Sequence, residues 1–216
     1  IRWMHPDHGL VPPDEFIHLA EQSGLIIELT QWVLRQSASQ AARWNKQGLH
    51  LNISVNLSPT SLLDAEFPDF MSGLLANHGL SGEVLTLEIT ESTLARDPDL
   101  ALKVLNRLHN LGLDISIDDF GTGYSSLAYI KNIPATELKI DRAFVEFMLE
   151  DESDMAIVKS TIDLAHNLRM KVVAEGVENI DVAKKLCELD CDILQGYYFS
   201  RPLPLDEFEN WLNNFS

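Results

Sequence analysis

Short apolar runs recur about every 30 residues along this chain and alternate with segments of helical periodicity. The candidate strands are residues 51–57, 84–90, 114–118, 136–140, 171–175 and 191–195. The candidate helices are residues 13–21, 25–47, 66–78, 98–110, 124–131, 153–168, 179–189 and 205–214. A strand followed by a helix is the repeating unit of parallel α/β folds. Because no linker or low-complexity tract divides the sequence, we predict one domain over residues 1–216.

The candidate strands have one apolar face and one polar face. In 84–90, the residues Leu85, Leu87 and Ile89 alternate with Thr86, Glu88 and Thr90. A parallel sheet covered by helices on both sides has nearly continuous apolar strands instead. A polar inner face is expected when helices cover only the outside and the inner face lines a lumen. We therefore predict a TIM-like β/α barrel with its site at the carboxyl ends of the strands.

Oxygen-bearing side chains gather at the ends of the first three of these strands. Asp118 and Asp119 are adjacent carboxylates, which repel each other unless a cation or protons compensate. Asn56 and Glu88 lie near the ends of the two preceding strands. Amide and carboxylate oxygens are the ligands that Mg²⁺ and Mn²⁺ prefer, so we predict that these four residues bind such ions, with Asp118 able to bridge two of them.

Two further candidates come from later strands. Lys139 lies between Leu138 and Ile140, and Glu175 follows Ala174. A lysine near two cations is suited to stabilise an attacking hydroxide, and Glu175 is a candidate general base. The alternative is that lysine and carboxylates form a buried ion network with a structural role.

A glycine-containing loop, residues 120–126, follows the aspartate pair. Its glycines and small hydroxyl residues suit a loop that gates a site. Glu91 is a candidate anchor for this loop, and the alternative is a solvated acid in a turn.

The formal net charge of −17 argues against a broad surface for DNA, RNA or a membrane. No apolar run reaches the length of a membrane span, and the start has no signal-peptide pattern. Two cysteines suit a reducing cytosol. We expect a cytoplasmic protein, or a cytoplasmic domain of a membrane-anchored parent.

Several segments, in this order and at this spacing, resemble the EAL domain, the bacterial cyclic di-GMP phosphodiesterase family. They are Ile1–Pro6, Val55–Ser58, Leu87–Ser92, Asp118–Ser126, Leu138–Arg142, Val173–Glu178 and Gln195–Tyr197. The resemblance covers essentially the whole chain. It implies a (β/α)8 barrel with an antiparallel first strand and hydrolysis of cyclic di-GMP to linear pGpG with two Mg²⁺ or Mn²⁺ ions.

The resemblance also implies roles for individual residues. Asn56, Glu88, Asp118 and Asp119 match the family's metal ligands, and Lys139 and Glu175 match its catalytic lysine and base. Arg2, Glu178 and Gln195 match residues that bind substrate, and Glu91 matches the glutamate that holds the loop after the paired aspartates. Homodimerisation through the domain and flanking sensory or GGDEF domains in the parent are further expectations.

The sequence departs from the family in one respect. The Glu-Ala-Leu motif, whose glutamate is itself a metal ligand on the first strand, belongs immediately before Ile1 and is absent here. We therefore expect an N-terminally truncated domain without that strand. Two other functions stay open: an inactive EAL domain that binds cyclic di-GMP or a protein partner, and another metal-dependent barrel enzyme such as an enolase-type lyase.

Overall fold

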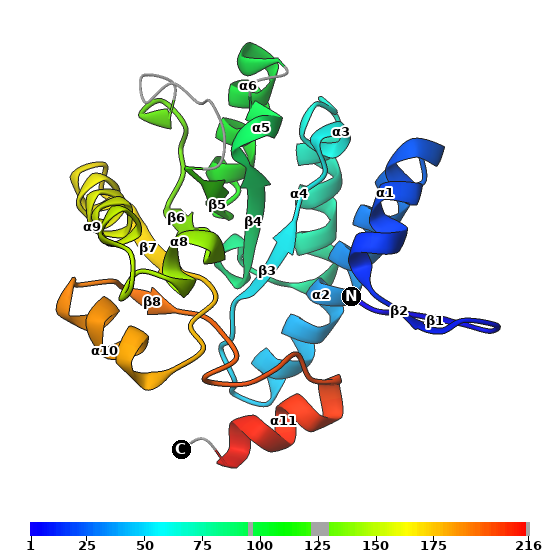
Figure 1. The fold of residues 1–216 in the computed structure, drawn as a ribbon. Helices are drawn as coiled ribbons and strands as arrows, with labels where there is room; N and C mark the ends of the chain where they lie inside the picture. Colours follow the sequence, from blue (N-terminus) through cyan, green and yellow to red (C-terminus); the bar gives the residue numbers. More distant parts are fainter. Residues whose placement is uncertain (95–96, 122–129, 215–216) are drawn as a thin grey trace. The chain divides into compact units, whose positions relative to one another are not determined.

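The computed structural model describes residues 1–94, 97–121 and 130–214, which form two compact units. Of these residues, 1–118 and 130–136 belong to the first unit, and 119–121 and 137–214 belong to the second. Figure 1 colours the elements of both units along the chain.

The first unit opens with an antiparallel hairpin of β1 (Trp3–His5) and β2 (Gly9–Val11). The elements that follow are α1 (Pro13–Ser23), α2 (Ile26–Lys46), β3 (Ile53–Asn56), α3 (Pro59–Leu62), α4 (Phe67–His78), the 3₁₀ helix η1 (Gly82–Val84), β4 (Leu85–Thr90), α5 (Glu91–Leu94), α6 (Pro98–Asn110) and β5 (Asp114–Phe120). The last two residues of β5 belong to the second unit.

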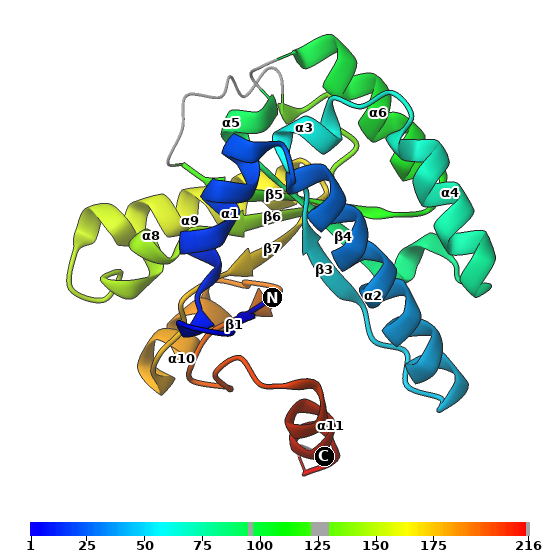
Figure 2. The same ribbon diagram turned by 90° about the vertical axis from the view of Figure 1, so that its right-hand side faces the viewer.

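Helices α2, α4 and α6 pack side by side in that order, and α2 also contacts β3 (Figure 2). Local sequence explains α6 well. Its start is capped by Asp97, whose side chain accepts a hydrogen bond from the backbone N–H of Leu100, and Pro98 fills the first helical position. Its buried residues are Ala101, Val104, Leu105 and Leu108, the spacing of one helical face.

Strands β3, β4 and β5 run parallel in adjacent positions. Asn56 is in register with Glu88, and Glu88 is in register with Ser116. One step further along, Thr90 is in register with Asp118. The alternating strand geometry therefore sends Asn56, Glu88, Ser116 and Asp118 to one face. The opposite face carries the fully buried side chains of Leu85, Leu87, Ile89, Ile115 and Ile117.

At the other end of β4 and β5, two loops meet backbone to backbone. A Cβ atom on Gly82 would lie 2.4 Å from the carbonyl carbon of Gly112 and 2.6 Å from the backbone nitrogen of Leu113. No side chain fits at such distances, so glycine at position 82 is required by the approach of the two loops.

The second unit continues the alternation of strands and helices. Its elements are β6 (Glu137–Ile140), α8 (Arg142–Glu146), α9 (Glu152–Asn167), β7 (Lys171–Ala174), α10 (Ile180–Glu188), β8 (Ile193–Leu194) and α11 (Leu205–Asn214). Strands β6, β7 and β8 are parallel neighbours, and α9 packs against both β6 and β7 (Figure 1). Helices α8, α9 and α10 begin at the caps Asp141, Asp151 and Asn179.

Each strand predicted from the sequence overlaps an observed strand, β3 to β8, and seven of the eight predicted helices are confirmed. The helix predicted over 124–131 falls mostly outside the described residues. The prediction of a single domain over 1–216 stays a prediction. In the described part of the chain, no helix combines the length and the apolar character that crossing a membrane requires.

Candidate active site

In the first unit, the candidate residues occupy the polar face of β3, β4 and β5. The whole-residue exposures of Glu88 and Asp118 are 7% and 9%, whereas Asn56, on the outer strand β3, is exposed. Burying a carboxylate is costly unless hydrogen bonds, cations or protonation compensate. The predicted ligands Asn56, Glu88 and Asp118 are thus brought onto one face of neighbouring strands, two of them in the interior.

Ser116 lies on the same face, in register with Glu88 and two residues before Asp118 in β5. Ser116 is fully buried, and its Oγ atom has no hydrogen-bond partner among the described residues. Buried hydroxyl groups nearly always have a partner in protein or water. Among the described residues, this hydroxyl is therefore the buried polar group on this face that still has hydrogen-bonding capacity to offer.

Glu91, the predicted loop anchor, is the first residue of α5, directly after β4. It is buried, with 4% exposure. The turn that places it is closed by a hydrogen bond of 2.8 Å between the hydroxyl groups of Thr90 and Thr93. Its burial argues against a solvated turn acid and fits a structural anchor.

Within residues 1–94, 97–121 and 130–214, no three His, Cys, Asp or Glu side chains gather as the ligands of one metal ion would. The predicted ligand set in the first unit consists of two carboxylates, from Glu88 and Asp118, and the side-chain amide of Asn56. The metal assignment therefore depends on the chemistry and register of these residues.

In the second unit, Lys139 and Glu175 form an ion pair. The Nζ atom of Lys139 lies 2.6 Å from Oε1 of Glu175, and the two side chains are 5% and 20% exposed. Lys139 lies in β6, and Glu175 follows β7, with its backbone N–H donating to the carbonyl oxygen of Ile140. The pair predicted to carry acid–base chemistry is thus in direct contact at the ends of adjacent strands.

A turn over residues 175–178 carries Glu175 and Glu178, and Arg142 of α8 contacts it. The Nη2 atom of Arg142 lies 2.9 Å from Oε1 of Glu178, and its Nε lies 3.1 Å from Oε2 of Glu146. The hydrogen bond to Glu146 and the charges of Glu146 and Glu178 raise the pKa of the Arg142 guanidinium. Gly176 has φ of +71°, and a Cβ there would lie 2.3 Å from Cγ of Arg142.

The same turn is bonded to the segment after β8. The backbone N–H of Val177 donates to the carbonyl oxygen of Gln195 at 3.0 Å, and Tyr198 N–H donates to the carbonyl oxygen of Val177 at 3.0 Å. A Cβ on Gly196 would lie 2.1 Å from that Val177 oxygen. The side chain of Gln195, predicted to bind substrate, is exposed.

Asp119 has a left-handed backbone conformation, with φ of 55°. Few residues other than glycine adopt it, and such conformations concentrate at functional sites. Gly121 follows with φ of 96°, and a Cβ there would lie 3.2 Å from the ring of Phe144 in α8. The predicted gating loop beyond Gly121 lies outside the described residues.

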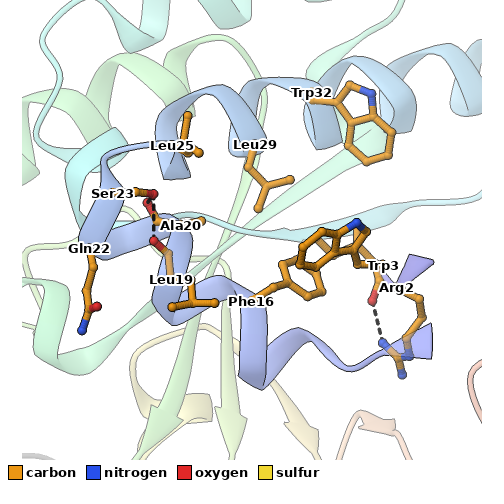
Figure 3. A pocket seen from close by; sticks show the side chains of 11 residues that line it. Arg2, Trp3, Phe16, Leu19, Ala20, Gln22, Ser23, Leu25, Leu29 and Trp32 are labelled. Carbon is orange, nitrogen blue, oxygen red and sulfur yellow. Dashed lines mark hydrogen bonds between the residues drawn. The ribbon is translucent and has the colours of Figure 1, made fainter. Parts of the chain in front are cut away.

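Arg2 lies elsewhere in the first unit, at the rim of an apolar pocket of about 780 Å³. Figure 3 shows Leu29 and Trp32 of α2 facing Phe16 and Trp3 across this pocket. The rings of Trp3 and Phe16 meet edge to face, with centroids 6.0 Å apart. Arg2 donates a hydrogen bond of 2.7 Å to the carbonyl oxygen of Ile1. The mostly apolar lining offers binding surface and no group for acid–base chemistry.

Sequence reasoning missed Arg142 as a site residue, although it lies three residues after Lys139. The alternation of apolar and polar residues identifies candidates only within strands, whereas Arg142 is the first residue of the short helix α8. The glycine at position 176, next to the predicted base, was the available signal that another group approaches the turn closely.

Comparison with known proteins identifies the family of the chain. The model of the EAL domain matches residues 1–202. The chain is 45% identical over 208 residues to the bifunctional diguanylate cyclase/cyclic di-GMP phosphodiesterase MucR of Pseudomonas aeruginosa, covering 96% of this chain and 30% of MucR. It is 42% identical over 216 residues to the cyclic di-GMP phosphodiesterase NbdA of the same organism, covering 100% of this chain and 28% of NbdA.

A solved structure of the PaMucR phosphodiesterase in complex with c-di-GMP matches with a TM-score of 0.92 and 45% identity. The match covers 96% of this chain and 84% of that one. The likeness confirms the TIM-like α/β fold class predicted from the sequence. The chain spans less than a third of the length of the two curated relatives. Since both the family model and the structural likeness extend over most of its length, the chain belongs to the EAL domain family.

Proposed function

We propose that this chain hydrolyses one phosphodiester bond of cyclic di-GMP, giving linear pGpG, with Mg²⁺ or Mn²⁺. The observation that carries the proposal is its likeness over 96% of its length to a phosphodiesterase structure that contains c-di-GMP.

The residues of the first unit fit a hard divalent cation. Asn56, Glu88 and Asp118 present amide and carboxylate oxygens on one face of adjacent strands. A cation there would offset the cost of burying the two carboxylates. The hydroxyl of Ser116, which has no hydrogen-bond partner in the described part of the chain, fits a site that a bound group completes. We assign Asn56, Glu88 and Asp118 as ligands, and we propose the same role for Asp119 because it directly follows Asp118 in the chain.

Two ions bound by such ligands would polarise the phosphoryl group and lower the pKa of an attacking water. In the proposed step, Glu175 accepts a proton from the water, whose oxygen bonds to phosphorus while the bond from phosphorus to the leaving sugar oxygen breaks. That oxygen then takes a proton from solvent water, and Glu175 returns its own proton to solvent. Lys139 donates to Oε1 of Glu175, so it orients the carboxylate and stabilises the negative charge that develops on the water.

The remaining assignments are proposals of the same kind. Arg2 would contact a phosphate of the substrate, and Gln195 would bind the ligand through its exposed side chain. Glu178 would also contribute to ligand binding, and Glu91, buried after β4, would hold the loop that follows Gly121.

A second candidate function is a cyclic di-GMP receptor without turnover. It is favoured by the direct contact between Lys139 and Glu175, since a buried ion pair is also a common structural element. The two functions differ in a measurable way: the receptor binds the ligand and releases no pGpG.

The test is incubation of the full-length protein with cyclic di-GMP and Mg²⁺ or Mn²⁺, followed by chromatography of the products. We expect pGpG from the wild type, and a loss of kcat of about 10²- to 10⁴-fold in Glu175→Gln. A matched control is Glu188→Gln, which changes an exposed glutamate paired with Lys185 on α10 and should keep full activity. A wild type that binds cyclic di-GMP without forming pGpG would establish the receptor instead.

The metal assignment has its own measurement. Titration of Mn²⁺ by calorimetry should show binding to the wild type and at least tenfold weaker binding to Asp118→Asn or Glu88→Gln. Equal affinities in the wild type and both variants would remove these two carboxylates from the ligand set.

We also propose that the parent works in the cytoplasm, carries sensory or GGDEF domains, and dimerises through this domain. The curated relatives are more than three times as long as this chain, which leaves room for such domains. Analytical ultracentrifugation of the full-length protein over a range of concentrations tests dimerisation, and a constant monomer mass would contradict it.

A further inference from the structure

The turn over residues 175–178 is held from several sides. Glu175 N–H donates to the end of β6, and Val177 N–H donates to the carbonyl oxygen of Gln195 after β8. Gly176, between these two anchored residues, has φ of +71°. Glycine restricts the backbone dihedral angles less than any other residue. The conformation of the turn can therefore change most easily at Gly176.

The side chain of Arg142 packs against Gly176, where the glycine itself has no side chain. Its Cγ, Cβ and Cδ atoms occupy the space around Gly176 that a side chain would need, at 2.3, 2.8 and 3.1 Å from the position of a Cβ. Beyond the stem, the guanidinium reaches Glu178 at the far end of the turn. The stem thus packs against the middle of the turn and the head bonds to its end.

These contacts contribute little to global stability, because the side chain of Arg142 is 50% exposed and ion pairs at such sites are weak. Their effect is on geometry. A displacement of about 1 Å at a catalytic group can lower turnover about a hundredfold.

We propose that Arg142 is a positioning residue, whose stem over Gly176 and ion pair with Glu178 hold the turn in the conformation that presents Glu175 to Lys139. The inference rests on the proposed function. Arg142 acts through the turn, and part of the effect of Glu178 on the reaction passes through Arg142.

The experiment combines kinetics with hydrogen exchange on the full-length protein. Arg142→Met keeps the aliphatic stem and removes the guanidinium, and Glu178→Gln removes its partner. We expect each to lower kcat about 10- to 100-fold, with the KM of Arg142→Met changed less than about threefold. The double variant should lose less than the product of the two single losses, because part of the effect is shared. The control Glu146→Gln removes the other partner of Arg142, away from the turn, and should leave kcat unchanged.

Hydrogen exchange, followed by mass spectrometry, should be about tenfold faster in a peptide covering residues 174–179 of Arg142→Met and unchanged in Glu146→Gln. Arg142→Lys, which restores a positive charge on a similar stem, should recover part of both effects. If Arg142→Met does not fold, Arg142→Lys and Glu178→Gln carry the same measurements.

The proposal is overturned if Arg142→Met leaves both kcat and exchange in the turn unchanged, or if Glu146→Gln matches Glu178→Gln in both. A wild type without turnover would refute the proposed function alone, because the exchange experiment needs no substrate and still decides whether Arg142 holds the turn.

Discussion

The ammonium group of Lys139 lies 2.6 Å from a carboxylate oxygen of Glu175, joining the penultimate residue of β6 to the residue that follows β7. Each charge compensates the other in a largely buried setting. This contact makes the candidate catalytic pair a structural element of the second unit as well, so its two roles have to be separated by measurement.

Lys139→Met should lower the free energy of unfolding by about 2–3 kcal/mol, because it leaves the carboxylate of Glu175 partly buried without its cation. Adding Glu175→Gln removes that charge too, so the double variant should recover at least about 1 kcal/mol of the loss. Urea unfolding followed by circular dichroism measures both quantities.

A matched control for this pair lies in α10, where Lys185 and Glu188 are 3.0 Å apart and 37% and 65% exposed. Lys185→Met should change the free energy of unfolding by less than about 0.5 kcal/mol. Strictly additive effects of Lys139→Met and Glu175→Gln would show that the buried pair is not coupled.

Gly176→Ala should destabilise the second unit by about 2 kcal/mol or more. The left-handed conformation is about 1–2 kcal/mol less favourable for alanine than for glycine, and the Cβ of alanine would also collide with the stem of Arg142. Arg142→Ala removes the nearest colliding atom, Cγ, so the cost of Gly176→Ala should fall in that background. Thermal melts of the four proteins give the coupling, and an equal cost in both backgrounds would show that the backbone conformation alone matters.

Ser116→Ala should leave stability unchanged or raise it by up to about 1 kcal/mol, because the hydroxyl is buried without a hydrogen-bond partner among the described residues. Thr86→Val, on the same face, is the comparison. It removes a hydroxyl that donates to Oδ1 of Asn52 at 2.9 Å and should cost about 1 kcal/mol. Chemical denaturation without added metal checks both, and a loss in Ser116→Ala as large as in Thr86→Val would reveal a partner for Ser116.

Asp192 gives the second unit a predictable dependence on pH. Partial burial acts to raise the pKa of its carboxyl group, but hydrogen bonds from Val172 N–H at 2.8 Å and from His166 at 2.9 Å outweigh it and lower the pKa. Since the folded-state pKa is below the unfolded value, the stabilisation is present above the unfolded pKa and is lost as the pH falls through the folded pKa.

Asp192→Asn should therefore lower stability near neutral pH by less than about 1 kcal/mol, given the exposure of the site, and should flatten the decline of stability in acid. Melting temperatures between pH 3 and pH 7 test this against Asp163→Asn, an exposed aspartate on α9. An unchanged acid slope in Asp192→Asn would contradict the assignment.

The strands and longer helices could be predicted from the sequence because their signals are local. Alternation with a period of two placed Glu88 and Asp118 on one face, and Asp97-Pro98 marked the start of α6. The helices α3 and α5 have four residues each, too few for a periodic signal, and the hairpin of β1 and β2 depends on pairing across a turn.

The ion pairs of the site could not be predicted in detail. Lys139 and Glu175 were identified individually from their strands, but their direct contact depends on the register of β6 with β7. Arg142 and Glu178 come from different elements, and only the folded chain brings them to 2.9 Å.

The contact between Gly82 and Gly112 has a consequence for the opposite end of the same strands. It sets the alignment of β4 with β5 from the end that holds no candidate catalytic residue. A slip of one residue would turn Glu88 toward the apolar face. Evolution can therefore vary the loops around the carboxyl ends, while the glycine contact at the opposite end keeps each candidate metal ligand at the same position along its strand.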